Sequence, residues 1–144
     1  MSAAPAEIAV PRAMPWSVAQ ALPAELDLGP GLDSGRLQGA MQRLIATEGV
    51  QAVVVFGSRA RGQAQADSDL DLAVICSVPQ LSPEQKRQYW QRCREVIGLL
   101  GCGVDLVIQG QADAAYLAQS RWHVMGDVAR EGRVLYAVTC AVCA

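Results

Sequence analysis

The fold is decided by two neighbouring segments, VVVFGSRARG at residues 53–62 and SDLDLAVI at residues 68–75. Residues 53–56 are β-branched or aromatic without interruption, which predicts a strand buried on both faces. The apolar residues between positions 70 and 75 predict a second strand. Glycine, serine and arginine between the two runs predict a loop. We therefore expect two neighbouring strands joined by a loop of polar and charged residues.

The start of this loop is suited to binding phosphate. Gly57 allows the backbone to approach a ligand closely, and the exposed amides of a Gly-Ser turn can form a concave anion site to which the Ser58 hydroxyl adds a donor. Arg59 and Arg61 carry planar, permanently charged groups that match phosphate oxygens, and their alternate positions let one point inward while the other faces water. We interpret these four residues as candidate nucleotide-binding residues.

The end of the loop carries a pair of acids. Asp69 and Asp71 are two positions apart at the start of the second strand, so both carboxylates lie on one face. Two negative charges this close repel each other unless a cation lies between them. Carboxylate ligands completed by nucleotide phosphates suit Mg²⁺ best. The pair is therefore predicted to form one half of a metal site. The same two residues are also candidate nucleotide-binding residues.

A third acid, Asp105, lies in a short apolar segment that is predicted as a strand over residues 103–108. A neighbouring strand can bring Asp105 alongside Asp69 and Asp71. Three acids from two strands can hold two metal ions about 3.5–4 Å apart, one on the nucleotide and one on the attacking hydroxyl, as in metal-assisted phosphoryl transfer. We expect these three aspartates to be the catalytic and metal-binding residues.

The order of these motifs resembles the DNA polymerase β-type nucleotidyltransferase superfamily. Residues 57–71 contain a Gly-Ser pair, ten intervening residues and an Asp-Leu-Asp motif, and a separate acidic strand follows at Asp105. The small size and the sequence GSRARG resemble its minimal nucleotidyltransferases (MNT). Many of these, such as the MntA-like proteins, are antitoxins encoded beside HEPN-domain ribonuclease toxins. The resemblance is densest over residues 51–75, continues through Asp105 and residues 130–136, and is absent from the first thirty or so residues.

The resemblance implies an α/β (α+β) fold in which a small mixed sheet is flanked by helices. It also implies ATP bound as a complex with two Mg²⁺ ions, and transfer of AMP to an acceptor hydroxyl while pyrophosphate leaves. In this sequence, Gly57 and Ser58 then hold the β- and γ-phosphates, and Asp69 and Asp71 hold the metals. Asp105 completes the second metal site and helps to deprotonate the acceptor. No residue indicates a base-specific contact, so ATP follows from the resemblance alone.

The pattern of helices and strands also favours a mixed sheet. Asp33 or Ser34 can cap a helix predicted over residues 35–47, and SPEQ at residues 82–85 combines an N-cap, a proline and a capping-box glutamine. The short loop permits an antiparallel first pair, whereas a helix before the third strand permits a crossover connection. Residues 111–132 are predicted to be helical with one break, followed by a short strand or an apolar tail. No GxxxxGK[ST] or GxGxxG motif occurs.

The chain divides into three predicted parts. Residues 1–33 are rich in proline and alanine and are predicted to be an extension without a core of its own, with Trp16–Leu22 as its only candidate helix. Residues 34–138 are predicted to be the minimal nucleotidyltransferase domain. Residues 139–144 are predicted to be a tail.

Several side chains are predicted to have structural rather than chemical roles. Tyr89 and Trp90 follow helical spacing and are predicted core residues. His123 has no acidic or thiol neighbour in the sequence and is predicted to lie on the surface or on a helix face. The five cysteines are predicted to be free thiols or tail residues rather than a disulfide framework: Cys76, Cys93, Cys102, Cys140 and Cys143.

Composition limits the classes of function. The chain has 144 residues, 51% of them hydrophobic, which predicts one soluble domain with one core. A net charge of −2 argues against direct nucleic-acid binding through a broad basic surface and favours a small-molecule or protein partner. No apolar run reaches membrane-spanning length, and the N-terminus lacks the pattern of a signal peptide, so we expect a cytoplasmic protein.

Three functions remain open from the sequence. The first is an antitoxin enzyme that transfers AMP to a hydroxyl of a partner HEPN toxin, with tyrosine as the favoured acceptor, in a hetero-oligomer. The second is a transferase that modifies a small molecule such as an aminoglycoside, for which a C-terminal helical domain is expected. The third is a non-catalytic antitoxin that neutralises its partner by covering it.

Overall fold

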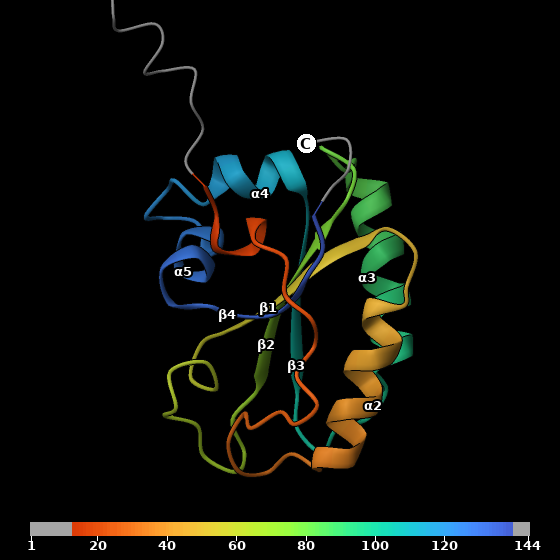
Figure 1. Ribbon diagram of the computed structural model, residues 1–144, viewed down its shortest axis with the longest axis vertical. Helices are drawn as coiled ribbons and strands as arrows, with labels where there is room; N and C mark the ends of the chain where they lie inside the picture. Colours follow the sequence, from red (N-terminus) through yellow and green to blue (C-terminus); the bar gives the residue numbers. More distant parts are fainter. Residues whose placement is uncertain (1–12, 140–144) are drawn as a thin grey trace, which may run out of the picture.

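The computed structural model describes residues 13–139, which form a four-stranded sheet with helices against both faces (Figure 1). The strand order across the sheet is β3-β2-β1-β4. The elements, in chain order, are η1 (Pro15–Ser17), α2 (Ser34–Ile45), β1 (Val50–Phe56), β2 (Leu70–Cys76), α3 (Pro83–Ile97), β3 (Val104–Gly110), α4 (Gln111–Leu117), α5 (Val124–Glu131) and β4 (Arg133–Ala137).

The sheet is mixed, as the sequence predicts. Strand β1 pairs in antiparallel fashion with β2 on one side and with β4 on the other, whereas β2 and β3 are parallel. The parallel pair is connected through α3, because a crossover is needed to return the chain to the same end of the sheet. The C-terminal end of β1 and the N-terminal ends of β2 and β3 consequently meet at one end of the sheet.

Hydrophobic side chains form a core on each face of the sheet. On one face, Leu70, Leu72 and Val74 pack with residues of α2 and α3. On the other face, Ala73 and Ile75 pack with η1, α4 and α5. Alternate residues of β2 therefore point to opposite faces, as the two-residue period of a strand requires. We call these the α2–α3 face and the α4–α5 face; the two helix pairs lie on opposite sides of the sheet in Figure 1.

The structure confirms the capping residues that the sequence predicts at the starts of two helices. The Asp33 side chain accepts a hydrogen bond of 2.9 Å from the Arg36 N–H and so caps α2. At α3, the Ser82 hydroxyl accepts from the Gln85 N–H at 3.2 Å, and the Gln85 side chain accepts from the Ser82 N–H at 2.8 Å. This reciprocal capping box satisfies two backbone donors that the helix itself leaves unpaired.

The N-terminal segment contributes side chains to the core of the domain. Met14, Trp16 and Leu28 are all buried, and Gln20 forms a backbone bridge with Ala137 of β4. Residues 13–33 thus pack onto the core of the domain instead of forming a core of their own; the first twelve residues lie outside the part that the structure describes. Prolines prevent regular helix but do not prevent burial, and only the short η1 forms where a helix over residues 16–22 was expected.

Trp90 is a second correction. The Trp90 side chain is 43% exposed, with the Arg94 guanidinium 5.5 Å from its ring centroid. The buried residues of α3 are Cys93 and Ile97, so the apolar stripe of this helix is narrower than its sequence indicates. Tyr89, in contrast, is partly buried against the α2–α3 core and agrees with the prediction.

The structure also locates His123 and three of the five cysteines. His123 is the N-cap of α5, where its Nδ1 accepts a hydrogen bond of 3.0 Å from the Met125 N–H. Cys76 and Cys93 are buried free thiols and Cys102 is a partly exposed one. Cys140 and Cys143 lie outside the described residues. No helix within residues 13–139 has the length and hydropathy needed to cross a membrane.

Candidate active site

The structure brings the three predicted aspartates to one end of the sheet. Asp71 of β2 is the direct register partner of Asp105 of β3. Because the two strands are parallel and in register, both side chains leave the sheet on the same face. Asp69 precedes Asp71 by two residues and is exposed, as is Asp105. The carboxylates lie on the α4–α5 face, at the end of the sheet remote from α4.

The ionisation of Asp71 reflects this arrangement. Its pKa is raised from 3.8 to about 6, chiefly because the carboxyl is partly buried. A hydrogen bond with Asp105 and the negative charges of Asp105 and Asp69 raise the pKa further, whereas the positive charge of Arg61 lowers it. Carboxylates that share a site destabilise each other's charged form in this way. The end of the sheet is therefore a position where a cation is electrostatically favoured.

The Gly-Ser turn passes directly beside Asp71. Gly57 has φ +73°, and a Cβ at this position would overlap the Asp71 carboxylate and lie 3.2 Å from its Cγ. The Gly57 carbonyl accepts hydrogen bonds from the N–H groups of Ala60 and Arg61, which closes the turn. The N–H of Ser58 donates no backbone hydrogen bond within residues 13–139, and the residue is partly exposed. The turn thus presents a donor next to the carboxylates.

Gly103 is a site residue that the sequence analysis did not single out. A Cβ at this position would lie 2.5 Å from Oδ1 of Asp69. The Gly103 carbonyl also accepts a hydrogen bond of 2.8 Å from the Leu70 N–H. The atoms that a Cβ would meet belong to the end of the Asp69 side chain, so a larger residue at position 103 would displace this carboxylate. In the sequence Gly103 resembles any glycine before a strand, so only the fold reveals its proximity to Asp69.

The two arginines of the loop have different environments. Arg61 is 40% exposed at its side chain and forms an ion pair of 3.1 Å with Glu131 at the end of α5. It lies close enough to Asp71 to lower the pKa of that carboxyl, so it stands at the edge of the site.

Arg59 does not fit its predicted role. Its side chain is 1% exposed, and each of its five N–H groups has a backbone carbonyl acceptor. A guanidinium buried in this way has no donor left for a phosphate oxygen. The expectation that Arg59 contacts nucleotide is therefore corrected: its side chain points away from the site and into the protein.

Residues 40–137 match the family model described as "Polymerase beta, Nucleotidyltransferase". The chain belongs to this nucleotidyltransferase family. The match includes the Gly-Ser turn and all three aspartates, and it starts after the N-terminal segment that packs against the core. Comparison with curated protein sequences gave no match.

Solved structures to which this chain is similar include two toxin–antitoxin complexes. One is a toxin–antitoxin with AMP-PNP; it is 21% identical, with a TM-score of 0.46, and the match covers 69% of this chain and 72% of the other. The second is the tri-AMPylated Shewanella oneidensis HEPN toxin in complex with MNT antitoxin; it is 19% identical, with a TM-score of 0.40, covering 68% of this chain and 67% of the other.

The donor set of the nucleotidyltransferase suits a hard cation. Asp71 and Asp105 provide carboxylate oxygens whose mutual repulsion a divalent ion relieves; burial is the largest cause of the raised pKa of Asp71, and the charge of Asp105 adds to it. No group of three or more acidic, histidine or cysteine side chains within residues 13–139 is arranged to hold a metal by itself. Mg²⁺ therefore stays a prediction; it is an ion that commonly uses one or two carboxylates together with nucleotide phosphates.

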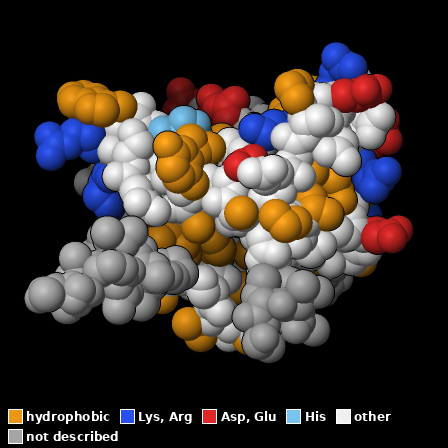
Figure 2. All heavy atoms as spheres, turned by 90° about the horizontal axis from the view of Figure 1, so that it is seen from above, with side chains coloured by type: hydrophobic (Ala, Val, Ile, Leu, Met, Phe, Trp, Pro, Cys, Tyr) orange, Lys and Arg blue, Asp and Glu red, His pale blue; other side chains and the backbone are white. Residues whose placement is uncertain are grey.

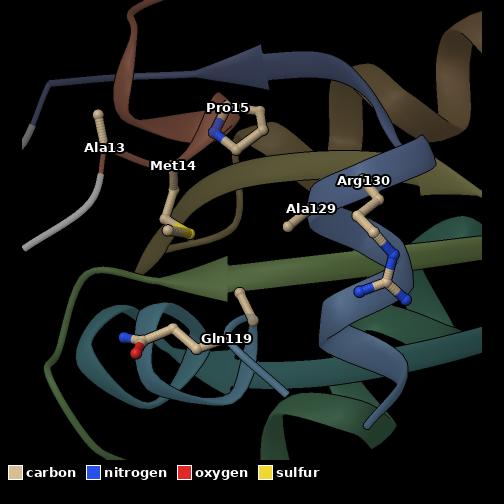
Figure 3. A pocket seen from close by; sticks show the side chains of 7 residues that line it. Ala13, Met14, Pro15, Gln119, Ala129 and Arg130 are labelled. Carbon is tan, nitrogen blue, oxygen red and sulfur yellow. The ribbon is translucent and has the colours of Figure 1, made fainter. Parts of the chain in front are cut away.

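The nucleotidyltransferase also has a cavity far from these carboxylates. Its volume is about 320 Å³, and it is lined by residues next to η1, after α4 and in α5, including Met14, Gln119 and Arg130 (Figure 3). None of the candidate site residues lines it. The end of the molecule near α4 is seen in Figure 2, where hydrophobic side chains lie between charged ones. The carboxylates lie at the opposite end.

Proposed function

We propose that this protein transfers AMP from Mg-ATP to a hydroxyl group of a partner HEPN-type ribonuclease toxin and thereby neutralises the toxin. The observation that carries the proposal is the register of Asp71 with Asp105, beside a Gly57–Ser58 turn with a free backbone donor. Nucleotidyl transfer requires acidic side chains and hydrogen-bond donors that bind phosphate. Both occur at one end of the sheet.

The turn is the proposed triphosphate site. The Ser58 N–H donates no backbone hydrogen bond within residues 13–139 and follows a turn that is closed by the Gly57 carbonyl, so this N–H and the Ser58 hydroxyl are the proposed donors to phosphate oxygens. Because a Cβ at Gly57 would overlap Asp71, the triphosphate and the carboxylates share one small space. Arg61, at the edge of the site, adds positive charge for the phosphates once it is released from Glu131.

The three aspartates are the proposed metal ligands, with Asp69 and Asp71 on the nucleotide side and Asp105 on the acceptor side. When bound, Mg²⁺ would offset the negative charge of the phosphates and favour ionisation of the acceptor hydroxyl. A group with a pKa near 6 is ionised at neutral pH, so Asp71 is ready to act as a ligand there.

The transfer step itself exchanges one bond for another. The acceptor oxygen forms a bond to the α-phosphorus, the bond between that phosphorus and the β-bridging oxygen breaks, and pyrophosphate leaves with the bonding electrons. Asp105 takes the proton of the acceptor hydroxyl, since it is an exposed acid on β3, which β2 separates from the strand that leads into the Gly57–Ser58 turn. The products are an AMP ester of the acceptor and pyrophosphate.

A protein acceptor is proposed on two grounds. The sequence resembles minimal nucleotidyltransferases that are antitoxins of HEPN toxins, and Asp69 and Asp105 are exposed at the surface, where a side chain of a large partner can reach them. Tyrosine is the favoured acceptor because its hydroxyl lies at the end of a long, rigid side chain. A net charge of −2 is suited to a protein partner, which we propose the protein meets in the cytoplasm.

The experiment is a transfer assay with ATP labelled at the α-phosphate. The protein, Mg²⁺ and a HEPN-type toxin are incubated together, with an aminoglycoside added in a parallel reaction and with γ-labelled ATP as the control for phosphoryl transfer. We expect α-label, and no γ-label, on a tyrosine of the toxin. Label on the aminoglycoside would instead identify a small-molecule transferase. A tight complex without label on either acceptor would identify an antitoxin that acts by binding alone.

A further inference from the structure

Arg59 is the only charged side chain among the fully buried residues that the structure describes, and the proposed chemistry does not use it. Its Nε and Nη2 donate to the Ser68 carbonyl at 3.1 and 2.8 Å. Its Nη1 donates to the carbonyls of Leu28 and Pro30 at 2.8 and 2.9 Å, and Nη2 also reaches the Gln65 carbonyl at 3.4 Å. No carboxylate within residues 13–139 forms an ion pair with it.

These contacts connect the two ends of the site loop. Arg59 directly follows Ser58 of the proposed phosphate turn, and Ser68 directly precedes the proposed metal ligand Asp69. One guanidinium therefore holds the start and the end of the loop at a fixed separation. A planar group with five donors can do this, whereas the ammonium group of lysine has three donors around one point.

The N-terminal segment provides the fixed support for this contact. Gly31 has φ +90°, and a Cβ at this position would overlap the Ala66 carbonyl and lie 2.7 Å from its carbon atom. Gly29, with φ +92°, approaches Arg59 itself, since its Cβ would lie 3.4 Å from Nη1. The loop is thus packed against residues 28–31 by backbone contacts as well as by the hydrogen bonds of Arg59.

We propose that Arg59 is a positioning residue of the transferase, which sets the distance between the phosphate turn at Ser58 and the metal ligand Asp69 before any substrate binds. This inference rests on the proposed function. Ligands held in place before binding lose little freedom when the substrate arrives, so metal and nucleotide bind more tightly. The N-terminal segment, through Leu28 and Pro30, becomes part of the active-site framework although it touches no substrate.

The test uses Arg59→Lys and Arg59→Met in the full chain, with Arg87→Met on the exposed surface of α3 as the matched control. The readouts are the Mg²⁺ concentration for half-maximal transfer, the affinity for an ATP analogue, and kcat, all measured at a temperature at which each variant is folded. Both Arg59 variants are expected to need roughly 10- to 100-fold more Mg²⁺, as for other supports of metal ligands. Arg87→Met is expected to behave as the wild type.

The outcomes separate positioning from simpler roles. If Arg59→Lys keeps the wild-type Mg²⁺ requirement, the positive charge suffices and positioning is refuted. If both variants only lose thermal stability and keep the Mg²⁺ requirement in the folded protein, the role is structural and the inference fails. If the wild type neither binds the ATP analogue with Mg²⁺ nor transfers AMP, the proposed function fails first, and the inference falls with it.

A measurement on the wild type keeps the inference falsifiable if the variants do not fold. Heteronuclear NOE values of the backbone amides in residues 58–68, recorded without ligand, report motion on the picosecond to nanosecond timescale. We expect values as high as those of β2, because both ends of the loop are held by Arg59. Low values across the loop would overturn the inference.

Discussion

Asp71 and Asp105 lie directly opposite each other on the parallel strands β2 and β3, where partial burial, and after it a hydrogen bond with Asp105, raises the pKa of Asp71 to about 6. The register of two strands fixes this pair, so its spacing does not depend on the conformation of a loop. The other half of the proposed site consists of Ser58 and Asp69, which lie in the loop between β1 and β2. The strand register of the acid pair and the Arg59 contacts of the loop are the reasons why we propose that the site is formed before substrate binds.

Replacement of Asp105 by asparagine should affect chemistry more than nucleotide binding. The variant removes the proposed proton acceptor, so kcat is expected to fall by roughly 10²- to 10⁴-fold. The affinity for an ATP analogue should change by much less, because Asp69, Asp71 and the turn remain. Rapid-quench measurement of AMP transfer and calorimetry of analogue binding distinguish the two effects. An equal loss of both would place Asp105 on the nucleotide side instead.

The stability of the metal-free protein should fall as pH rises through the range in which Asp71 ionises. Its pKa is about 6 in the folded protein against 3.8 for the free group, so the folded state binds the proton more tightly. Its contribution to stability is present at low pH and is lost between about pH 4 and pH 6. In Asp71→Asn, the Tm in chelator should fall less over this range. Parallel curves for the two proteins would show that Asp71 is not the group responsible.

The contact between Gly57 and Asp71 can be isolated with a matched pair of glycines. Gly57 and Gly62 have nearly the same φ, +73° and +72°, but a Cβ at Gly62 would have no neighbour within 4 Å. Each alanine variant should lose roughly 1–2 kcal/mol of unfolding free energy from the backbone conformation alone. Only Gly57→Ala should also abolish transfer, because its Cβ displaces the carboxylate. Chemical denaturation and the transfer assay are the measurements, and equal activity of the two variants would contradict this account.

The N-terminal segment should contribute to the stability of the domain. Trp16 is 3% exposed and belongs to the core of the α4–α5 face, whereas Val18, two residues later, is 70% exposed. Trp16→Ala should lower the free energy of unfolding by about 3–5 kcal/mol. Val18→Ala should change it by less than about 0.5 kcal/mol. Similar values in urea denaturation for both variants would mean that the segment is not part of the folded unit.

The sequence predicts those features that depend on neighbouring residues. Ser82 and Gln85 form the capping box that their spacing indicates, and Asp33 caps α2. Asp69 and Asp71 lie on one face because a strand has a two-residue period. The parallel alignment that brings Asp105 beside them follows from one crossover helix. Each of these relationships is local or follows from a simple topological rule.

Features that depend on distant contacts were mispredicted or missed. The sequence around Arg59 suggests that this side chain binds phosphate. Its burial, however, depends on the carbonyls of Leu28 and Pro30, which are far away in the chain. Trp16 lies among prolines, and its burial depends on β1, β4 and α5 coming together. Trp90 follows the period of α3 closely enough to be expected in the core, but the helix turns it toward solvent. No local pattern distinguishes these cases.

The most direct test of the central claim is the binding of Mn²⁺, as a paramagnetic substitute for Mg²⁺, with a non-hydrolysable ATP analogue, followed by electron paramagnetic resonance. The wild type and Asp67→Asn, an exposed acid of the same loop, are expected to bind Mn²⁺ tightly only when the analogue is present. Asp69→Asn and Asp71→Asn should each weaken that binding by roughly 10- to 100-fold while the protein stays folded. Equal binding by the wild type and Asp71→Asn, or no analogue-dependent binding by the wild type, would contradict the account.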